Sequence, residues 1–223
     1  MVQTKPCPDR DWPEEDAILE AVLEEVPFEG WTAAALRRTE RRLNLPAESL
    51  DVLYPDGLAD LLEAWAALLD RRMAESFPPE RLAGMRVRER IAELVFWRIG
   101  QLMAHREAVR RLLAHAALPA QGALLARRLW RTADTIWWLA GDQATDINYY
   151  TKRAILAGVM SATLLAALDD GSPDLAETRA FLERRIADVM RFEKIKAGWR
   201  EQRRYLPSLT RFLGRLRYPP ERF

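Results

Sequence analysis

The sequence of 223 residues contains only one cysteine, Cys7, and only two histidines, His105 and His115. A single cysteine excludes an intramolecular disulfide and is compatible with a reducing compartment. Neither histidine has a glutamate three residues before it, so the spacing of di-iron carboxylate ligands is missing. Nucleophile-elbow, P-loop and GxGxxG patterns are missing as well. We therefore expect no metal, no cofactor and no enzymatic activity.

Long apolar runs are also absent. The longest, Ile155 to Leu168, is too short to span a bilayer. Residues 1–15 have no apolar h-region and contain Pro6, Pro8 and Pro13, so they predict a disordered lead rather than a signal peptide.

Glycine is scarce, with 10 residues, and alanine, leucine, arginine and glutamate dominate, which favours an all-α fold. Apolar spacing predicts a first helix over Asp16–Val26, ended by Pro27 and Gly30. Further helices are expected in this order: Thr32–Leu43, Pro46–Leu53, Leu58–Phe77, Arg81–Ala104, His105–Ala116, Pro119–Ala140, Asp146–Leu168 and Pro173–Phe192. Gly198 and Pro207 predict a looser segment after the last of these.

Three short helices followed by a longer fourth resemble the N-terminal half of a TetR-type repressor. A ligand-responsive transcriptional regulator is therefore the alternative function. Residues 14–65 hold thirteen acidic and four basic side chains, a net charge of −9, and the recognition-helix candidate contains Glu48 and Asp51 but no basic residue. DNA binding requires lysine or arginine near the phosphates. We expect no nucleic-acid partner, with the helix-turn-helix kept as architecture only.

The other end of the chain has the opposite charge. Residues 191–223 hold ten basic and three acidic side chains, a net charge of +7. The stretch Tyr205–Tyr218 has an apolar side and a basic side, which is typical of a helix at a membrane interface. Packing of this helix on the domain is the alternative. The expected membrane-binding residues are Leu206, Leu209, Phe212, Leu213, Leu216, Arg211, Arg215 and Arg217.

Aromatic, acidic and glycine residues are densest in the stretch Trp137–Arg153. Gly141 suits a left-handed helix C-cap, and Thr145 or Asp146 offers an N-cap for the next helix. The rings predict either a junction between two helices whose rings lie half in the core and half on the surface, or a partner-binding patch. In the second case Tyr149, Tyr150 and Arg153 share one exposed face. The candidate partner-binding residues are Trp137, Asp142, Asp146, Asn148, Tyr149, Tyr150 and Arg153.

The run WWLAGDQATDINYYTKR resembles the signature of the coenzyme Q biosynthesis accessory lipid-binding proteins, the ninth Coq protein of eukaryotes and its proteobacterial relatives. VPFEGWTAAALRR and LPSLTRFLGRLRYP also fit, and the resemblance extends from about Asp16 to Pro219. Tyr149 stands where relatives often have tryptophan. The resemblance implies a TetR-like homodimer that binds isoprenoid lipid or phospholipid. It also implies presentation of quinone intermediates to a membrane-associated demethoxyubiquinone hydroxylase.

Three segments with different roles are expected after the lead: a vestigial helix-turn-helix unit at 16–57, a lipid-binding and dimerisation domain at 58–196, and a membrane-binding helix at 197–223. The expected location is peripheral on the bacterial inner membrane, or on the matrix side of the mitochondrial inner membrane in a eukaryote. The candidate lipid-binding residues are Phe96, Ile99, Leu102, Met103, Leu129, Ala133, Ile136 and Met160.

Overall fold

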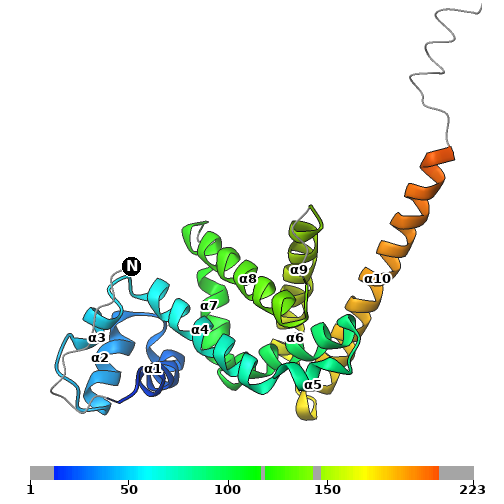
Figure 1. Ribbon diagram of the computed structural model, residues 1–223. Helices are drawn as coiled ribbons and strands as arrows, with labels where there is room; N and C mark the ends of the chain where they lie inside the picture. The colour runs from blue at the N-terminus through cyan, green and yellow to red at the C-terminus, as the bar shows by residue number, and fades with distance from the viewer. Residues whose placement is uncertain (1–12, 117–118, 143–146, 206–223) are drawn as a thin grey trace, which may run out of the picture. The chain divides into compact units, whose positions relative to one another are not determined.

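The computed structural model describes residues 13–116, 119–142 and 147–205, and the side chains in these ranges except those of residues 120, 147–148 and 192–205. Within these ranges the regular elements are helices, and no strand is present (Figure 1). This confirms the all-α prediction. The elements are α1 (Glu15–Glu29), α2 (Ala33–Arg42), α3 (Ser49–Leu53), α4 (Leu58–Ser76), α5 (Pro79–Ala83), α6 (Val87–Ala104), α7 (Arg106–His115), α8 (Pro119–Leu139), α9 (Ile147–Asp169), a 3-10 turn η1 (Pro173–Leu175) and α10 (Ala176–Tyr205).

The chain divides into two compact units, residues 1–182 and residues 183–223. The first unit holds α1 to α9 and the beginning of α10. Helix α10 continues through the described part of the second unit. The expected division of the chain at residues 57 and 196 stays a prediction.

The N-terminal helices share a hydrophobic core with α4 and α7. Helix α1 buries the stripe Ile18, Leu19, Val22, Leu23 and Val26, whose spacing places these residues on one side of a helix. The indole rings of Trp31 and Trp65 lie 5.8 Å apart, and Trp31 Nε1 donates a hydrogen bond to Ala108 O at 2.9 Å. The core therefore passes without interruption from α1 to α4 and α7.

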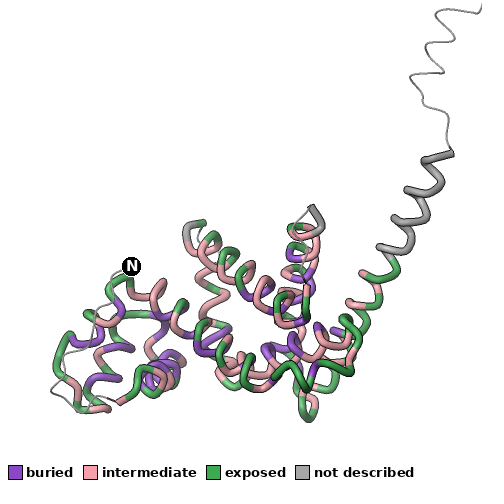
Figure 2. Tube along the Cα trace, viewed as in Figure 1, coloured by how far each residue is buried: buried purple, intermediate pink, exposed green. Residues whose placement is uncertain are grey.

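A second group of buried residues comes from α6, α8 and α9. These three helices pack against one another and present their buried sides inward (Figure 2). The group contains Leu94, Val95, Ile99, Ala133, Ile136, Ala140, Leu156, Val159 and Met160.

Several helix boundaries differ from the expected ones. Helix α1 continues past Pro27 to Glu29, because the proline stands in the last turn, where Gly30 N still bonds to Val26 O at 2.8 Å. The expected helix Arg81–Ala104 is broken at Gly84, and α6 restarts with a capping box between Arg86 and Glu89. Helix α10 continues through Gly198 to Tyr205, so the expectation of a looser backbone there is wrong.

Helix α9 also corrects the sequence analysis. Its segment Tyr149–Asp169 is long and apolar enough to cross a membrane, with a mean hydropathy of 1.3 over the most apolar window. Small and polar residues divide the apolar sequence of α9 into shorter runs, but they lower its mean hydropathy only slightly. Since 33% of that window is buried within the protein and core helices can have the same composition, this finding assigns no membrane span.

Candidate functional site

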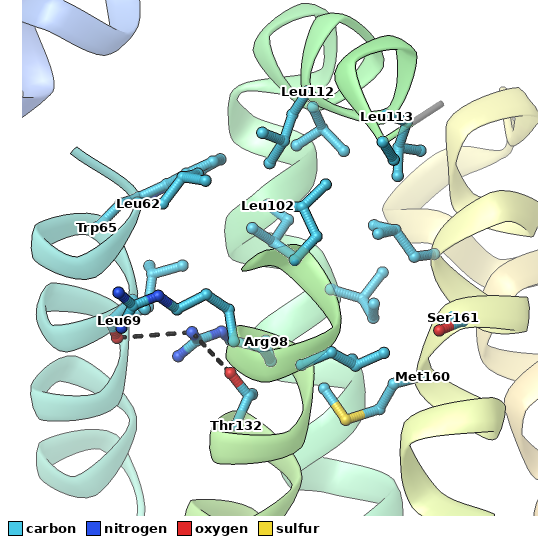
Figure 3. A pocket seen from close by; sticks show the side chains of 18 of the residues that line it. Leu62, Trp65, Leu69, Arg98, Leu102, Leu112, Leu113, Thr132, Met160 and Ser161 are labelled. Carbon is cyan, nitrogen blue, oxygen red and sulfur yellow. Dashed lines mark hydrogen bonds between the residues drawn. The ribbon is translucent and has the colours of Figure 1, made fainter. Parts of the chain in front are cut away.

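A cavity of about 290 Å³ lies among α4, α6, α7, α8 and α9 (Figure 3). Leucine is the commonest residue of its lining, and Trp65, Val109 and Met160 add further apolar surface. The amphipathic patterns of five helices build it, because the apolar stripe of each turns toward the same space. The polar side chains in the lining are Arg98, Arg128, Thr132 and Ser161. The cavity thus offers an apolar enclosure with a small polar part.

Four of the eight candidate lipid-binding residues line this cavity, namely Ile99, Leu102, Leu129 and Met160. The other four lie outside its lining. Ala133 and Ile136 are fully buried in the packed core, Met103 packs against the core of the N-terminal helices, and Phe96 lies 4.0 Å beneath the guanidinium of Arg179.

Lining residues from α4 and α7 were missed by the sequence analysis, among them Leu62, Trp65, Leu112 and Leu113. Their amphipathic stripes are visible in the sequence. Their position on a common cavity depends on how the helices pack.

Arg98 is 4% exposed and belongs to the polar part of the cavity wall. Its Nη1 donates to Asp70 Oδ1 at 2.5 Å. Its Nη2 lies 3.4 Å from Thr132 Oγ1 and 3.5 Å from Ala66 O (Figure 3). Burial lowers the pKa of the Arg98 guanidinium, although Asp70 opposes this shift. The side chain still carries its charge, because arginine remains protonated in proteins.

A second arginine of the lining, Arg128, pairs with Glu63, which also binds Arg131 at 3.0 Å. Burial and the nearby charge of Arg131 lower the pKa of Arg128, and Asp60 opposes them. Arg128 and Thr132 are four residues apart on α8 and therefore share a face of the helix. The two cations of the cavity wall thus come from different helices and each has a carboxylate partner.

The corner between α8 and α9 is organised around Arg153, which is 3% exposed. Its Nε donates to Asp134 Oδ1 at 2.5 Å, its Nη1 lies 3.3 Å from Asp142 Oδ2, and its guanidinium lies 3.4 Å from the centre of the Tyr149 ring. Burial alone lowers the pKa of Arg153, but the hydrogen bond and charge of Asp134 raise it overall. The expectation that Arg153 shares an exposed face with the tyrosines is therefore wrong. Two carboxylates from α8 and its C-terminal turn hold it inside.

Further contacts close this corner. Lys152 Nζ binds Asp142 Oδ1 at 2.6 Å, and Trp137 Nε1 donates to Lys152 O at 3.2 Å. Gly141 has φ +89°, which confirms the predicted left-handed C-cap. A Cβ on Gly141 would approach Arg90 Nη1 to 3.3 Å, so both conformation and space favour glycine.

Aromatic rings cover the outside of the same corner. Trp138 is 71% exposed and Tyr150 is 63% exposed. Tyr150 stacks on Trp130 at 6.3 Å and meets Tyr149 edge-on at 5.1 Å. We call Trp130, Trp138, Tyr149 and Tyr150 the aromatic patch. The candidate residues include the half-buried Trp137 and not its exposed neighbour Trp138. The helical phase on α8 could have indicated this difference, because Trp137 is four and three residues from the buried Ala133 and Ala140.

The remaining candidate residues lie at the limits of the structure. Asp146 and all eight membrane-binding candidates, from Leu206 to Arg217, lie outside the described residues, and only the backbone of Asn148 is described. In the described part of the chain, no group of three or more histidine, cysteine, aspartate or glutamate side chains is arranged to hold a metal ion.

Comparisons with known proteins give one consistent family. Residues 123–193 match the COQ9 family model. The chain is 32% identical over 180 residues to the bovine protein titled "Ubiquinone biosynthesis protein COQ9, mitochondrial", covering 78% of this chain and 56% of the bovine one. It is 33% identical to the rat COQ9 protein over 180 residues, covering 78% of this chain and 57% of that one.

The Schizosaccharomyces pombe coq9 protein is 30% identical over 172 residues, covering 76% of this chain and 67% of that protein. The chain thus spans little more than half the length of the mammalian relatives.

The fold also matches a solved structure. A TetR transcriptional regulator from Nitrosomonas europaea aligns with a TM-score of 0.64 and 21% sequence identity, covering 77% of this chain and 95% of that one. This likeness confirms the TetR-like fold and, at that identity, shows the fold alone. Together with the sequence matches, which run through the α8–α9 corner, these findings show that the chain belongs to the COQ9 family.

Proposed function

We propose that this chain is a non-enzymatic accessory protein of ubiquinone biosynthesis. In this proposal it binds an isoprenoid quinone intermediate in its cavity and presents it to a membrane-associated hydroxylase. The observation that carries the proposal is a leucine-lined cavity of about 290 Å³ in a member of the COQ9 family. Ligand pockets commonly occupy roughly 300–1,000 Å³. The volume therefore suits a ring and the first part of an apolar tail, and a longer tail would extend beyond the cavity.

Mass spectrometry of lipid extracted from the purified full chain tests this proposal. We expect an isoprenoid lipid in near-stoichiometric amount. Ala66 lines the cavity, whereas the neighbouring Ala67 is exposed on α4. Ala66→Phe should fill the space and lower the bound lipid several-fold, and the matched control Ala67→Phe should leave it unchanged. Equal lipid content in both variants would contradict binding in this cavity.

The aromatic patch is the proposed contact for the hydroxylase. Exposed tryptophan and tyrosine side chains are frequent anchors of protein interfaces. Helices α8 and α9 both line the cavity and carry the patch, so a bound ligand would lie behind the helices that meet the partner. Trp138→Ala should leave the unfolding free energy within about 0.5 kcal/mol, because the side chain is exposed, and weaken hydroxylase binding about tenfold or more. Phe28→Ala is the control, since Phe28 is also 71% exposed but lies on α1. Unchanged binding by Trp138→Ala would contradict this assignment.

Two further contacts belong to the proposal. The basic stretch Tyr205–Tyr218 would bind anionic membranes, and removing the chain from Glu201 onward should abolish co-sedimentation with anionic vesicles without lowering the melting temperature.

A homodimer would form through α9, where Leu165 is 58% exposed and a Cβ on Gly158 meets no atom within 4 Å. Light scattering of the wild type and of Gly158→Arg tests the dimer, since a charged side chain on this face should yield monomers.

A transcriptional regulator is the second candidate, favoured by the TetR-like fold. The N-terminal charges oppose it. Arg38 binds Glu25 at 2.7 Å and Glu29 at 2.9 Å, and Arg37 binds Glu40 at 2.9 Å. Arg42 pairs with Glu24 and with Glu25. These cations are engaged within the protein, so DNA binding would require breaking the ion pairs. Salt-sensitive micromolar binding to duplex DNA would support the regulator instead.

A further inference from the structure

The polar part of the cavity wall holds hydrogen-bond donors that the fold does not fully use. Arg98 Nη2 is 3.4 Å from Thr132 Oγ1 and 3.5 Å from Ala66 O. Both distances exceed the range of about 2.7–3.2 Å that N–H···O hydrogen bonds prefer. The Nη2 group is therefore only weakly bonded, although it belongs to a side chain that is 4% exposed. Placing a ligand oxygen beside it would satisfy a donor that water reaches poorly.

Thr132 differs from three other hydroxyl side chains of α8 and α9. Thr135, Ser161 and Thr163 each donate to the carbonyl oxygen four residues earlier in their own helix, at 3.2, 2.9 and 2.7 Å. Thr132 makes no such bond. Its oxygen faces Arg98 Nη2, and its hydrogen has no acceptor among the described residues. Thr132 as a whole residue is 7% exposed, and it lines the cavity. The hydrogen of its hydroxyl group is therefore available to a ligand in the cavity.

A third donor lies one turn earlier on the same face of α8. Arg128 Nε is buried and has no hydrogen-bond partner within the described ranges. The polar part of the wall therefore offers N–H and O–H groups from α6 and α8. Such a set favours a ligand group that accepts hydrogen bonds.

The charges at this wall indicate that the acceptor is uncharged. Each of the two arginines in the lining pairs with one carboxylate, Arg98 with Asp70 and Arg128 with Glu63. Their formal charges cancel, so an anionic head would gain no net attraction while losing its hydration. A carbonyl group loses less hydration and still accepts the available hydrogen bonds.

We infer that the Arg98–Thr132 wall binds the uncharged, carbonyl-bearing head of an amphipathic ligand. The tail then lies along the leucines of α7 and α8. Figure 3 shows Leu112 and Leu113 at the opposite side of the cavity from Arg98 and Thr132. The inference rests on the proposed function and adds an orientation to it. A quinone enters with its ring toward α6 and α8, and its oxygen atoms are withheld from solvent until release.

Vesicle extraction tests this orientation. Phosphatidylcholine vesicles carry equal amounts of three probes that share a decyl tail: a dimethoxy-methyl-benzoquinone, decylbenzene and decyl phosphate. The full chain is incubated with the vesicles and separated by gel filtration, and mass spectrometry quantifies the bound probes. We expect the wild type to be enriched in the quinone about tenfold over decylbenzene and over decyl phosphate.

Variants of Thr132 give the matched comparison. Thr132→Val keeps the shape of the side chain and removes the hydroxyl, so its preference for the quinone should fall about threefold to tenfold. Thr132→Ser should restore the preference. Thr163→Val is the control, because Thr163 is fully buried but lies outside the cavity lining.

The outcomes separate the two proposals. If no probe is extracted at all, the proposed function fails together with the inference. If all three probes are extracted equally, or if Thr132→Val keeps the full preference while remaining folded, only the head orientation is overturned. Preference for decyl phosphate would overturn the assignment of an uncharged head.

Discussion

In the described part of the chain two arginine side chains are almost fully buried, Arg98 at 4% exposure and Arg153 at 3%. Both are bonded to aspartate, but their surroundings differ. Arg153 lies between two aspartates and beneath the Tyr149 ring, with Nη1 also donating to Tyr149 O at 3.2 Å. Arg98 has one short bond, to Asp70, and two long ones beside a cavity.

The difference shows that burial of a charge alone does not identify a binding site. Arg153 joins α8 to α9 and uses its donors within the fold, whereas Arg98 keeps a weakly bonded donor in the wall of a cavity. The first arrangement fixes a structural corner beneath the aromatic patch. The second is suited to a ligand.

The largest expected effect follows removal of the better-bonded arginine. Arg153→Met leaves Asp142, whose side chain is 6% exposed, without one of its cations. Breaking a buried ion pair typically costs about 3–5 kcal/mol, and we expect a loss of that order in the free energy of unfolding, measured in urea. Arg71→Met is the control, since Arg71 and Asp16 form an exposed pair worth less than about 1 kcal/mol. A similar small loss for both variants would show that the buried Arg153 contributes no more to stability than the exposed Arg71.

Arg98→Met should cost less. Its partner Asp70 has a side chain that is 30% exposed, so water can replace part of the lost interaction. We expect a loss of about 1–3 kcal/mol in the same urea experiment. A loss greater than that of Arg153→Met would reverse the comparison and make Arg98 a structural clamp between α4, α6 and α8.

A buried acid whose carboxylate is held by hydroxyl and backbone N–H groups extends the comparison. Asp170 accepts hydrogen bonds from Ser172 N and Oγ at 2.7 and 2.5 Å, and from Thr178 N and Oγ1 at 2.8 and 2.6 Å. These bonds hold the pKa of Asp170 well below its ordinary value. Because the folded pKa is the lower one, the stabilisation is present above about pH 4 and is lost as the pH falls toward the folded pKa.

Asp170→Asn should therefore lower the melting temperature by a few degrees at pH 7. The gap from the wild type should narrow as the pH falls below about 4, as measured by thermal melts across this range. The exposed Asp174 provides the control variant Asp174→Asn. A gap that does not change with pH would show that the ionised carboxylate contributes nothing.

The smallest effect concerns a buried hydroxyl without a partner. Tyr54 is 3% exposed, and its Oη has no hydrogen-bond partner within the described residues. Tyr54→Phe should change the unfolding free energy by less than about 1 kcal/mol at pH 7. Burial, with the charges of Glu15 and Asp16, raises the pKa of Tyr54, so the wild type loses stability as the pH rises above about 10. The variant should lose less in alkaline urea titrations, and equal alkaline losses would contradict this.

The sequence was sufficient to predict the all-α class, most helices and the left-handed cap at Gly141, because these depend on local propensity and spacing. It also placed Ile99, Leu102, Leu129 and Met160 on faces that line the cavity.

Contacts between distant segments were not predictable in the same way. Arg98 and Asp70 are 28 residues apart, and Arg153 and Asp134 are 19 apart, so their pairing depends on helix packing that no local pattern contains. For the same reason the spacing of Tyr149 and Arg153 indicated a common face without indicating that the arginine turns inward.

Trp65 belongs both to the cavity lining and to the core of the N-terminal helices, where its ring lies 5.8 Å from Trp31. Trp31 is in turn bonded to the backbone of α7 at Ala108. Helices α1 to α3 therefore cannot move away from the rest of their unit without opening one wall of the cavity. Local opening in this region and access of solvent to the cavity become a single event. If a ligand fills the cavity as proposed, it should slow proteolytic cleavage between α1 and α3, and the N-terminal helices would then help to retain it.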